Sequence, residues 1–169
     1  MKKFVFLFIS LVLLLSFCGC SAILPPEEAS TEATENTPIF AICDGKVIEP
    51  YKSFLWAETW SGDGWIAADG MRISSQLPTI SHTLPTINGK DFDIHYGSGI
   101  SPESISVYNS EFECIHNTDE PCPTDLLEEG TYYLVITVIE QGKFIPLQGK
   151  HESSCYEYAY KIVIQNDEN

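Results

Sequence analysis

The chain has 169 residues, with 24 acidic and nine basic side chains and a formal net charge of −15. A hydrophobic fraction of 44% and an aromatic fraction of 12% are enough to form a core, which excludes wholesale disorder. The acidic balance argues against nucleic acid as a partner, because one polyanion repels another.

The first twenty residues have the pattern of an export signal. Two lysines precede an uncharged apolar run from residue 4 to residue 17, as in a bacterial secretory signal peptide. Residues 17–20, Phe-Cys-Gly-Cys, resemble the lipobox of bacterial lipoproteins, in which a small residue precedes the cysteine that is acylated. The resemblance implies cleavage after Gly19 and a lipid on Cys20, which would anchor the protein in the membrane.

An uncleaved N-terminal helix is the alternative, because residues 4–24 carry no charge and are long enough to span a bilayer. Both interpretations place the remainder of the chain on the extracytoplasmic face of the cell membrane. We therefore divide the chain into a lipoprotein signal peptide (1–19), a lipidated cysteine with an acidic, disordered linker (20–37), and one domain (38–169).

The pattern of the domain predicts strands almost throughout. Apolar and polar residues alternate over residues 91–96 and 156–165, while Thr131–Ile139 is apolar on nearly both faces, as in a central strand. The shorter candidate strands are Ile39–Cys43, Ser53–Trp60, Glu103–Tyr108 and Glu111–His116. The only helical candidate is a turn at Thr124–Glu129. Short strands separated by glycine-containing turns predict an all-β, antiparallel β-sandwich.

Residues 127–132, Leu-Glu-Glu-Gly-Thr-Tyr, resemble the tyrosine corner of immunoglobulin-like domains. The matching positions are Glu128, Gly130 and Tyr132, and the resemblance extends over residues 126–164. It implies an immunoglobulin-like sandwich in which the Tyr132 hydroxyl bonds to upstream backbone. Leu134 occupies the position of the antibody core cysteine, so the antibody-type disulfide is absent. The resemblance implies no function.

A four-residue repeat lies before the middle of the domain. Leu77-Pro78-Thr79-Ile80 recurs seven residues later as Leu84-Pro85-Thr86-Ile87. Two prolines within ten residues exclude a central strand, so we expect an edge or crossover connection here, with a recognition loop as the alternative.

Four cysteines belong to the domain, and an even number in an exported protein predicts two disulfides. Three pairings are possible, and we favour Cys114–Cys122, which closes a short loop, together with Cys43–Cys155. Cys114 is expected to lie on the inward face of its strand. A structural zinc site using Cys114, His116 and Cys122 is the alternative, although paired Cys-x-x-Cys spacing is absent.

Catalytic motifs are absent from the sequence. The four histidines lie outside recognised catalytic or metal-binding patterns, and neither His-Glu-x-x-His nor Gly-x-Ser-x-Gly occurs. We therefore expect a non-enzymatic protein without a metal or cofactor.

The segment from Trp56 to Trp65 is the best candidate binding feature. Trp56, Glu58 and Trp60 alternate along one predicted strand, and indoles beside a carboxylate suit stacking on sugar rings and bonding to their hydroxyls. The alternative is that Trp56 and Trp60 are core residues together with Phe54.

Two functional hypotheses follow. The first is a lipid-anchored, non-catalytic β-sandwich that engages another cell-envelope protein through a strand edge or its end loops, because edge strands offer unpaired backbone groups. The second, from a different class, is a glycan-binding or cell-wall-binding domain that uses Trp56, Glu58, Trp60 and Trp65.

Overall fold

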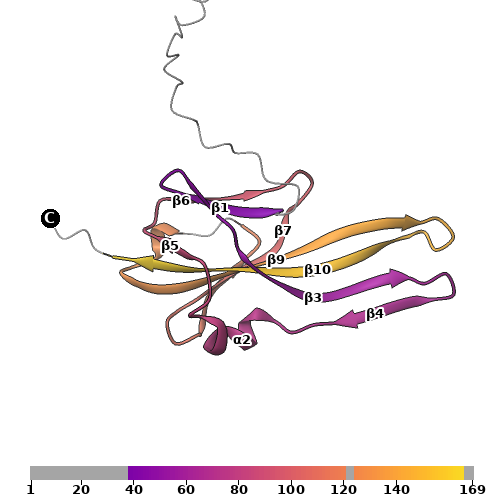
Figure 1. Ribbon diagram of the computed structural model, residues 1–169, viewed down its shortest axis with the longest axis horizontal. Coiled ribbons are helices and arrows are strands. Elements are labelled where there is room, and N and C mark those ends of the chain that lie inside the picture. The colour runs from indigo at the N-terminus through magenta and orange to yellow at the C-terminus, as the bar shows by residue number, and fades with distance from the viewer. Residues whose placement is uncertain (1–37, 121–123, 166–169) are drawn as a thin grey trace, which may run out of the picture. The chain divides into compact units, whose positions relative to one another are not determined.

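Two long antiparallel strands, β9 (Gly130–Ile145) and β10 (Lys150–Ile164), form the centre of the larger of two sheets (Figure 1). The computed structural model describes residues 38–120 and 124–165. In the larger sheet the strands follow the order β4-β3-β10-β9-β7-β8. The added strands are β3 (Tyr51–Trp60), β4 (Trp65–Asp69), β7 (Pro102–Tyr108) and β8 (Cys114–Thr118). The described residues are therefore mainly antiparallel strands, as predicted.

A three-stranded sheet covers one face of the larger sheet, which we call the inner face. Its order is β2-β1-β6, formed by Lys46–Ile48, Ile39–Cys43 and Phe92–Tyr96. The core between the sheets joins β1 to alternate residues of β9 and β10, among them Leu134, Ile136, Tyr158 and Tyr160. Burial raises the pKa of the Tyr158 and Tyr160 hydroxyls, and the Glu140 carboxylate raises that of Tyr158 further.

A short helix, α2 (Ile73–Ile80), covers part of the opposite, outer face of the larger sheet. Ile73 and Leu77 of the helix pack against Tyr133 and Val135 of β9 in a second core cluster. Because both faces of β9 are covered at this point, its sequence is apolar on both sides, as predicted for a central strand.

The first copy of the Leu-Pro-Thr-Ile repeat lies in α2, a helix that the sequence pattern did not predict. Pro78 lies inside the helix, where proline removes a hydrogen bond and disfavours helix. At the start of α2, the N–H of Ile73 donates to the carboxylate of Glu157, a buried residue of β10. Contacts with the sheet therefore stabilise a helix that its own sequence disfavours.

The second copy of the repeat leads into a strand. Strand β5 (Thr86–Asn88) pairs in parallel with the end of β10, and the N–H of Lys161 donates to the carbonyl of Pro85. Ile87 is fully buried between the two sheets, whereas Leu84 packs beneath α2. The repeat therefore connects the two faces of the larger sheet, in agreement with the predicted crossover.

The predicted strands are present, with shifted boundaries in several cases. β1 coincides with Ile39–Cys43, while β9 and β10 extend well beyond the predicted segments. Residues 111–113 precede β8 instead of belonging to it. Three short strands, β2, β4 and β5, were not predicted. The helical candidate at Thr124–Glu129 is reduced to the 3-10 turn η1 (Thr124–Leu126).

The predicted Cys43–Cys155 disulfide is wrong. Both residues are buried free thiols. Cys43 belongs to the core on the inner face, where its thiol donates to the Asn88 carbonyl. Cys155 directly precedes Tyr156, whose side chain lies on the inner face, and so the Cys155 side chain points to the outer face. The backbone of the larger sheet lies between the two sulfur atoms.

The expectation for Cys114 is also wrong, because Cys114 is a free, exposed thiol and not the buried half-cystine of a Cys114–Cys122 disulfide. Its partner Cys122 lies outside the described residues.

The predicted signal peptide, the predicted lipid-bearing Cys20 and the predicted linker also lie outside the described residues. Within residues 38–120 and 124–165, none of the helices is long and apolar enough to cross a membrane.

Candidate functional site

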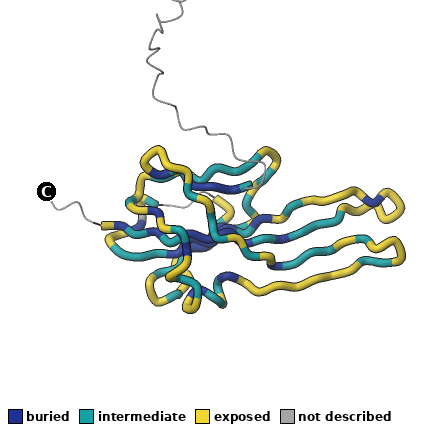
Figure 2. The backbone as a smooth tube through the Cα atoms, in the orientation of Figure 1, coloured by how far each residue is buried: buried dark blue, intermediate teal, exposed yellow. Residues whose placement is uncertain are grey.

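The β3–β4 and β9–β10 hairpins run side by side beyond the region that α2 and the small sheet cover. Figure 2 shows buried positions concentrated where the layers overlap, and exposed or partly exposed positions along the two hairpins. Four residues on the outer face of these hairpins, Trp56, Glu58, Trp60 and Trp65, form what we call the tryptophan face.

The geometry of β3 and β4 brings these four residues together. Trp56, Glu58 and Trp60 are alternate residues of β3 and share one face, and Trp65 of β4 lies directly opposite Trp60. The Trp60 and Trp65 rings meet edge to face, with centroids 5.6 Å apart and an interplanar angle of 63°. The three indoles are partly exposed, and none belongs to either core cluster.

A β-bulge separates Phe54 from this face. The pairing of β3 with β10 shifts by one residue, so that Trp56 lies opposite Cys155 while Phe54 lies opposite Tyr156. Because Cys155 and Tyr156 point to opposite faces, Phe54 and Trp56 do so too. Phe54 packs edge-on against Tyr156 and remains 37% exposed. The alternative in which Trp56 and Trp60 form a core with Phe54 is therefore wrong.

A lysine from the other hairpin completes the tryptophan face. The Lys150 ammonium binds the Glu58 carboxylate and lies 4.7 Å from the centroid of the Trp65 ring. These are an ion pair and a cation–π contact. The backbone N–H of Trp60 donates to Glu152 Oε1 at 2.8 Å. Lys150 and Glu152 thus attach the tips of the two hairpins to each other.

The outer face continues from the tryptophans towards α2. Trp56 lies between two residues of the neighbouring strands, Asp69 on β4 and the buried Cys155 on β10. Burial raises the pKa of the Cys155 thiol, Glu157 raises it further, and Arg72 at the start of α2 lowers it. The tryptophan face therefore ends at a charged boundary where the helix begins.

Sequence reasoning placed Trp56, Glu58, Trp60 and Trp65 together but missed Lys150. That lysine is 92 residues from Glu58 in the chain, and its role depends on how the hairpins are paired. The Gly62-Asp63-Gly64 turn between Trp60 and Trp65 was a local signal for the β3–β4 hairpin, and it would have placed the two indoles opposite each other.

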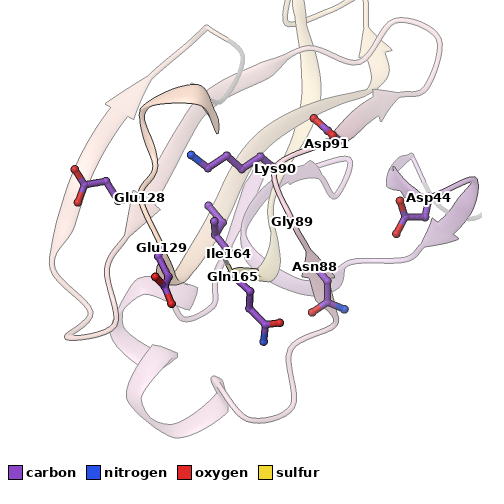
Figure 3. A pocket seen from close by; sticks show the side chains of 9 residues that line it. All are labelled: Asp44, Asn88, Gly89, Lys90, Asp91, Glu128, Glu129, Ile164 and Gln165. Carbon is purple, nitrogen blue, oxygen red and sulfur yellow. The ribbon is translucent and has the colours of Figure 1, made fainter. Parts of the chain in front are cut away.

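An open polar cavity of about 810 Å³ lies at the opposite end of β10 and is lined by nine residues (Figure 3). Four of them are acidic: Asp44, Asp91, Glu128 and Glu129. Their carboxylates point in different directions and do not converge on one point. Within the described residues, His, Cys, Asp and Glu side chains form no group that could hold a metal ion.

The residues of the predicted tyrosine corner lie at the start of β9. Gly130 is its first residue and Glu128 is exposed. The Tyr132 ring folds back beside Gly130, with its hydroxyl 3.6 Å from the position that a Cβ atom on Gly130 would occupy. Tyr132 also packs against the core between the sheets.

No family model, no curated protein and no solved structure matches this chain.

Proposed function

We propose that this protein is a membrane-tethered, non-catalytic binding module that presents the tryptophan face to carbohydrate in the extracytoplasmic space. The observation that carries the proposal is the position of all three tryptophans on one sheet face, where they are partly exposed and lie next to the Glu58–Lys150 ion pair. The tether is supported by the pattern of an export signal in residues 1–19 and by the resemblance of the segment ending at Cys20 to a lipobox.

The chemistry of the face suits a sugar chain. The C–H groups on one side of a pyranose ring pack against an indole, while its hydroxyls need donors and acceptors at the edge of the ring. Glu58 and Lys150 provide acceptors and donors between the indoles, and their side chains are 40% and 51% exposed. The arrangement is a face on a sheet, not an enclosed pocket, and so it suits an extended polysaccharide better than a single sugar.

Two interpretations from the sequence remain predictions within this proposal. The two-sheet arrangement and the position of Tyr132 support an immunoglobulin-like sandwich. The open strand edges support a second candidate function, the capture of a cell-envelope protein through a strand edge.

Calorimetry on the full chain tests carbohydrate binding, in a detergent whose headgroup is not a sugar. The ligands are soluble oligosaccharides of glucose, mannose and N-acetylglucosamine. We expect at least one to bind, and Trp60→Ala to weaken that binding by at least about 10-fold, or about 1.4 kcal/mol. Phe54→Ala, which removes an aromatic ring from the opposite face of β3, should leave affinity unchanged. Binding that is equally sensitive to both substitutions would contradict the proposal.

A further inference from the structure

Strand β4 is the outermost strand on its side of the larger sheet and pairs with β3 alone among the described residues. Its other edge therefore presents the outward N–H and C=O groups of Trp65–Asp69. Four of its five residues are exposed, and the Ile66 side chain is 54% exposed. Such an edge is a template for another strand.

Several other open edges among the described residues carry features that hinder strand pairing. β6, an edge of the small sheet, pairs regularly with β1 but carries the charged Asp93 within the strand. β2 is three residues long and begins with Lys46. β8 contains a bulge at Ile115. Beyond Val138, where the pairing with β7 ends, the open edge of β9 is distorted by a register shift near Lys143. Lysines, bulges and short length are the usual protections of edge strands. β4 pairs regularly with β3, has no proline or lysine, and carries its only charge at its last residue, Asp69.

We propose that the open edge of β4 pairs antiparallel with β4 of a second copy of this chain, with Ala67 on the two-fold axis. The sequence Trp-Ile-Ala-Ala-Asp is complementary to itself in this register. Ala67 faces Ala67, Ile66 faces Ala68 and Trp65 faces Asp69 of the other copy. All five residues overlap. A register centred on Asp69 would place two like charges directly opposite each other, which destabilises a strand pair.

The proposed register has a consequence for the tryptophan face. Directly opposed residues of paired strands share a face, so the tryptophan faces of the two copies would join into one surface. Trp65 of each copy would lie beside Asp69 of the other. The dimer itself rests on the edge of β4 and not on carbohydrate binding, so either proposal can fail without the other.

The interface is small and the copies repel each other. A pair of five-residue strands belongs to the class of weak, transient interfaces, which bury less than about 1,200 Å². The net charge of −15 opposes association of two copies, and salt screens that repulsion. We therefore expect a concentration-dependent dimer that becomes stronger as the salt concentration rises.

Variants that place opposite charges at Ala67, on the two-fold axis, test the proposal. Sedimentation of the full chain in detergent measures the fraction of dimer. Ala67→Glu and Ala67→Lys should each prevent dimerisation, because like charges meet on the axis, and an equimolar mixture of the two should dimerise. Ile115→Glu and Ile115→Lys on β8 are the matched controls, since they change net charge equally on another exposed edge. Each control variant alone should dimerise like the wild type.

Hydrogen exchange of the wild type gives a second measurement, because amides of β4 should exchange more slowly as protein concentration rises. Circular dichroism checks that each variant is folded. A wild type that stays monomeric from micromolar to millimolar concentration would overturn the proposal. So would Ala67 variants that dimerise as well as the wild type, since that result places the interface elsewhere.

Discussion

The buried carboxylate of Glu157 connects the strand layer to the helix layer. It is 3% exposed and accepts a hydrogen bond from the N–H of Ile73, the first residue of α2. The first turn of the helix is Ile-Ser-Ser-Gln and has no acidic residue. Replacing Glu157 by alanine should therefore leave the Ile73 N–H buried without an acceptor and remove the negative charge at the helix N-terminus.

The expected cost combines two effects. A buried donor left without its acceptor costs about 1–3 kcal/mol. A negative charge at a helix N-terminus contributes about 0.3–1 kcal/mol, and up to about 2 when it is partly buried. We expect Glu157→Ala to lower the free energy of unfolding by about 2–3 kcal/mol. Glu157→Gln keeps an acceptor oxygen and loses only the charge, so we expect a loss of about 1 kcal/mol.

Urea denaturation followed by circular dichroism measures these free energies, with Glu128→Ala as the control because Glu128 is an exposed acid. Native-state hydrogen exchange adds a local readout at Ser81, whose N–H donates to the Leu77 carbonyl at the end of α2. That amide should exchange faster in Glu157→Ala, while the β9–β10 ladder changes less. A loss of under about 0.5 kcal/mol for Glu157→Ala would refute the reasoning.

Three further predictions concern the core and the turns. Burial raises the pKa of the Tyr160 hydroxyl, so the contribution of Tyr160 to stability is complete below about pH 10 and is lost as pH rises further. In Tyr160→Phe, the free energy of unfolding should fall less steeply with pH in the alkaline range, as monitored by circular dichroism. Native alkylation with peptide mapping should modify Cys114 and spare the buried thiols Cys43 and Cys155, which react only after denaturation; modification of all three at equal rates would contradict the structure. Gly70→Ala should destabilise the domain by more than about 2 kcal/mol in urea titrations, because the added Cβ would clash with the main-chain oxygen of Phe54 on β3; an unchanged midpoint would show that the backbone can move.

The sequence was sufficient for most of the strands but not for the short strands β2, β4 and β5. A half-buried strand of five or more residues usually shows its alternation of apolar and polar residues locally. Tyr156, Tyr158 and Tyr160 lie on one face of β10, as their spacing predicted. The helix α2 was not predictable in this way, since its cap is a carboxylate 84 residues away and its interior contains Pro78. Its stability comes from tertiary packing against the sheet, which local propensity does not include.

The disulfide prediction failed and the tryptophan prediction succeeded in part for a related reason. Pairing Cys43 with Cys155 required knowing which face of the sheet each occupies, and a sequence count of cysteines contains no such information. Trp56 and Trp60 share a strand, so their common face was visible in their spacing. Whether that face was covered depended on where the small sheet and α2 pack, and Lys150 reaches it from a separate hairpin.

The indole N–H signals of the full chain test the central claim most directly. The chain has three tryptophans, so an ¹⁵N-labelled sample should give three such signals, all reporting on the tryptophan face. Titration with the oligosaccharide that binds in calorimetry should shift the signals of Trp60 and Trp65 together, in a saturable manner, while backbone amides beside Phe54 move less. If oligosaccharide binds and all three indole signals stay in place, the sugar is held elsewhere and the account is contradicted.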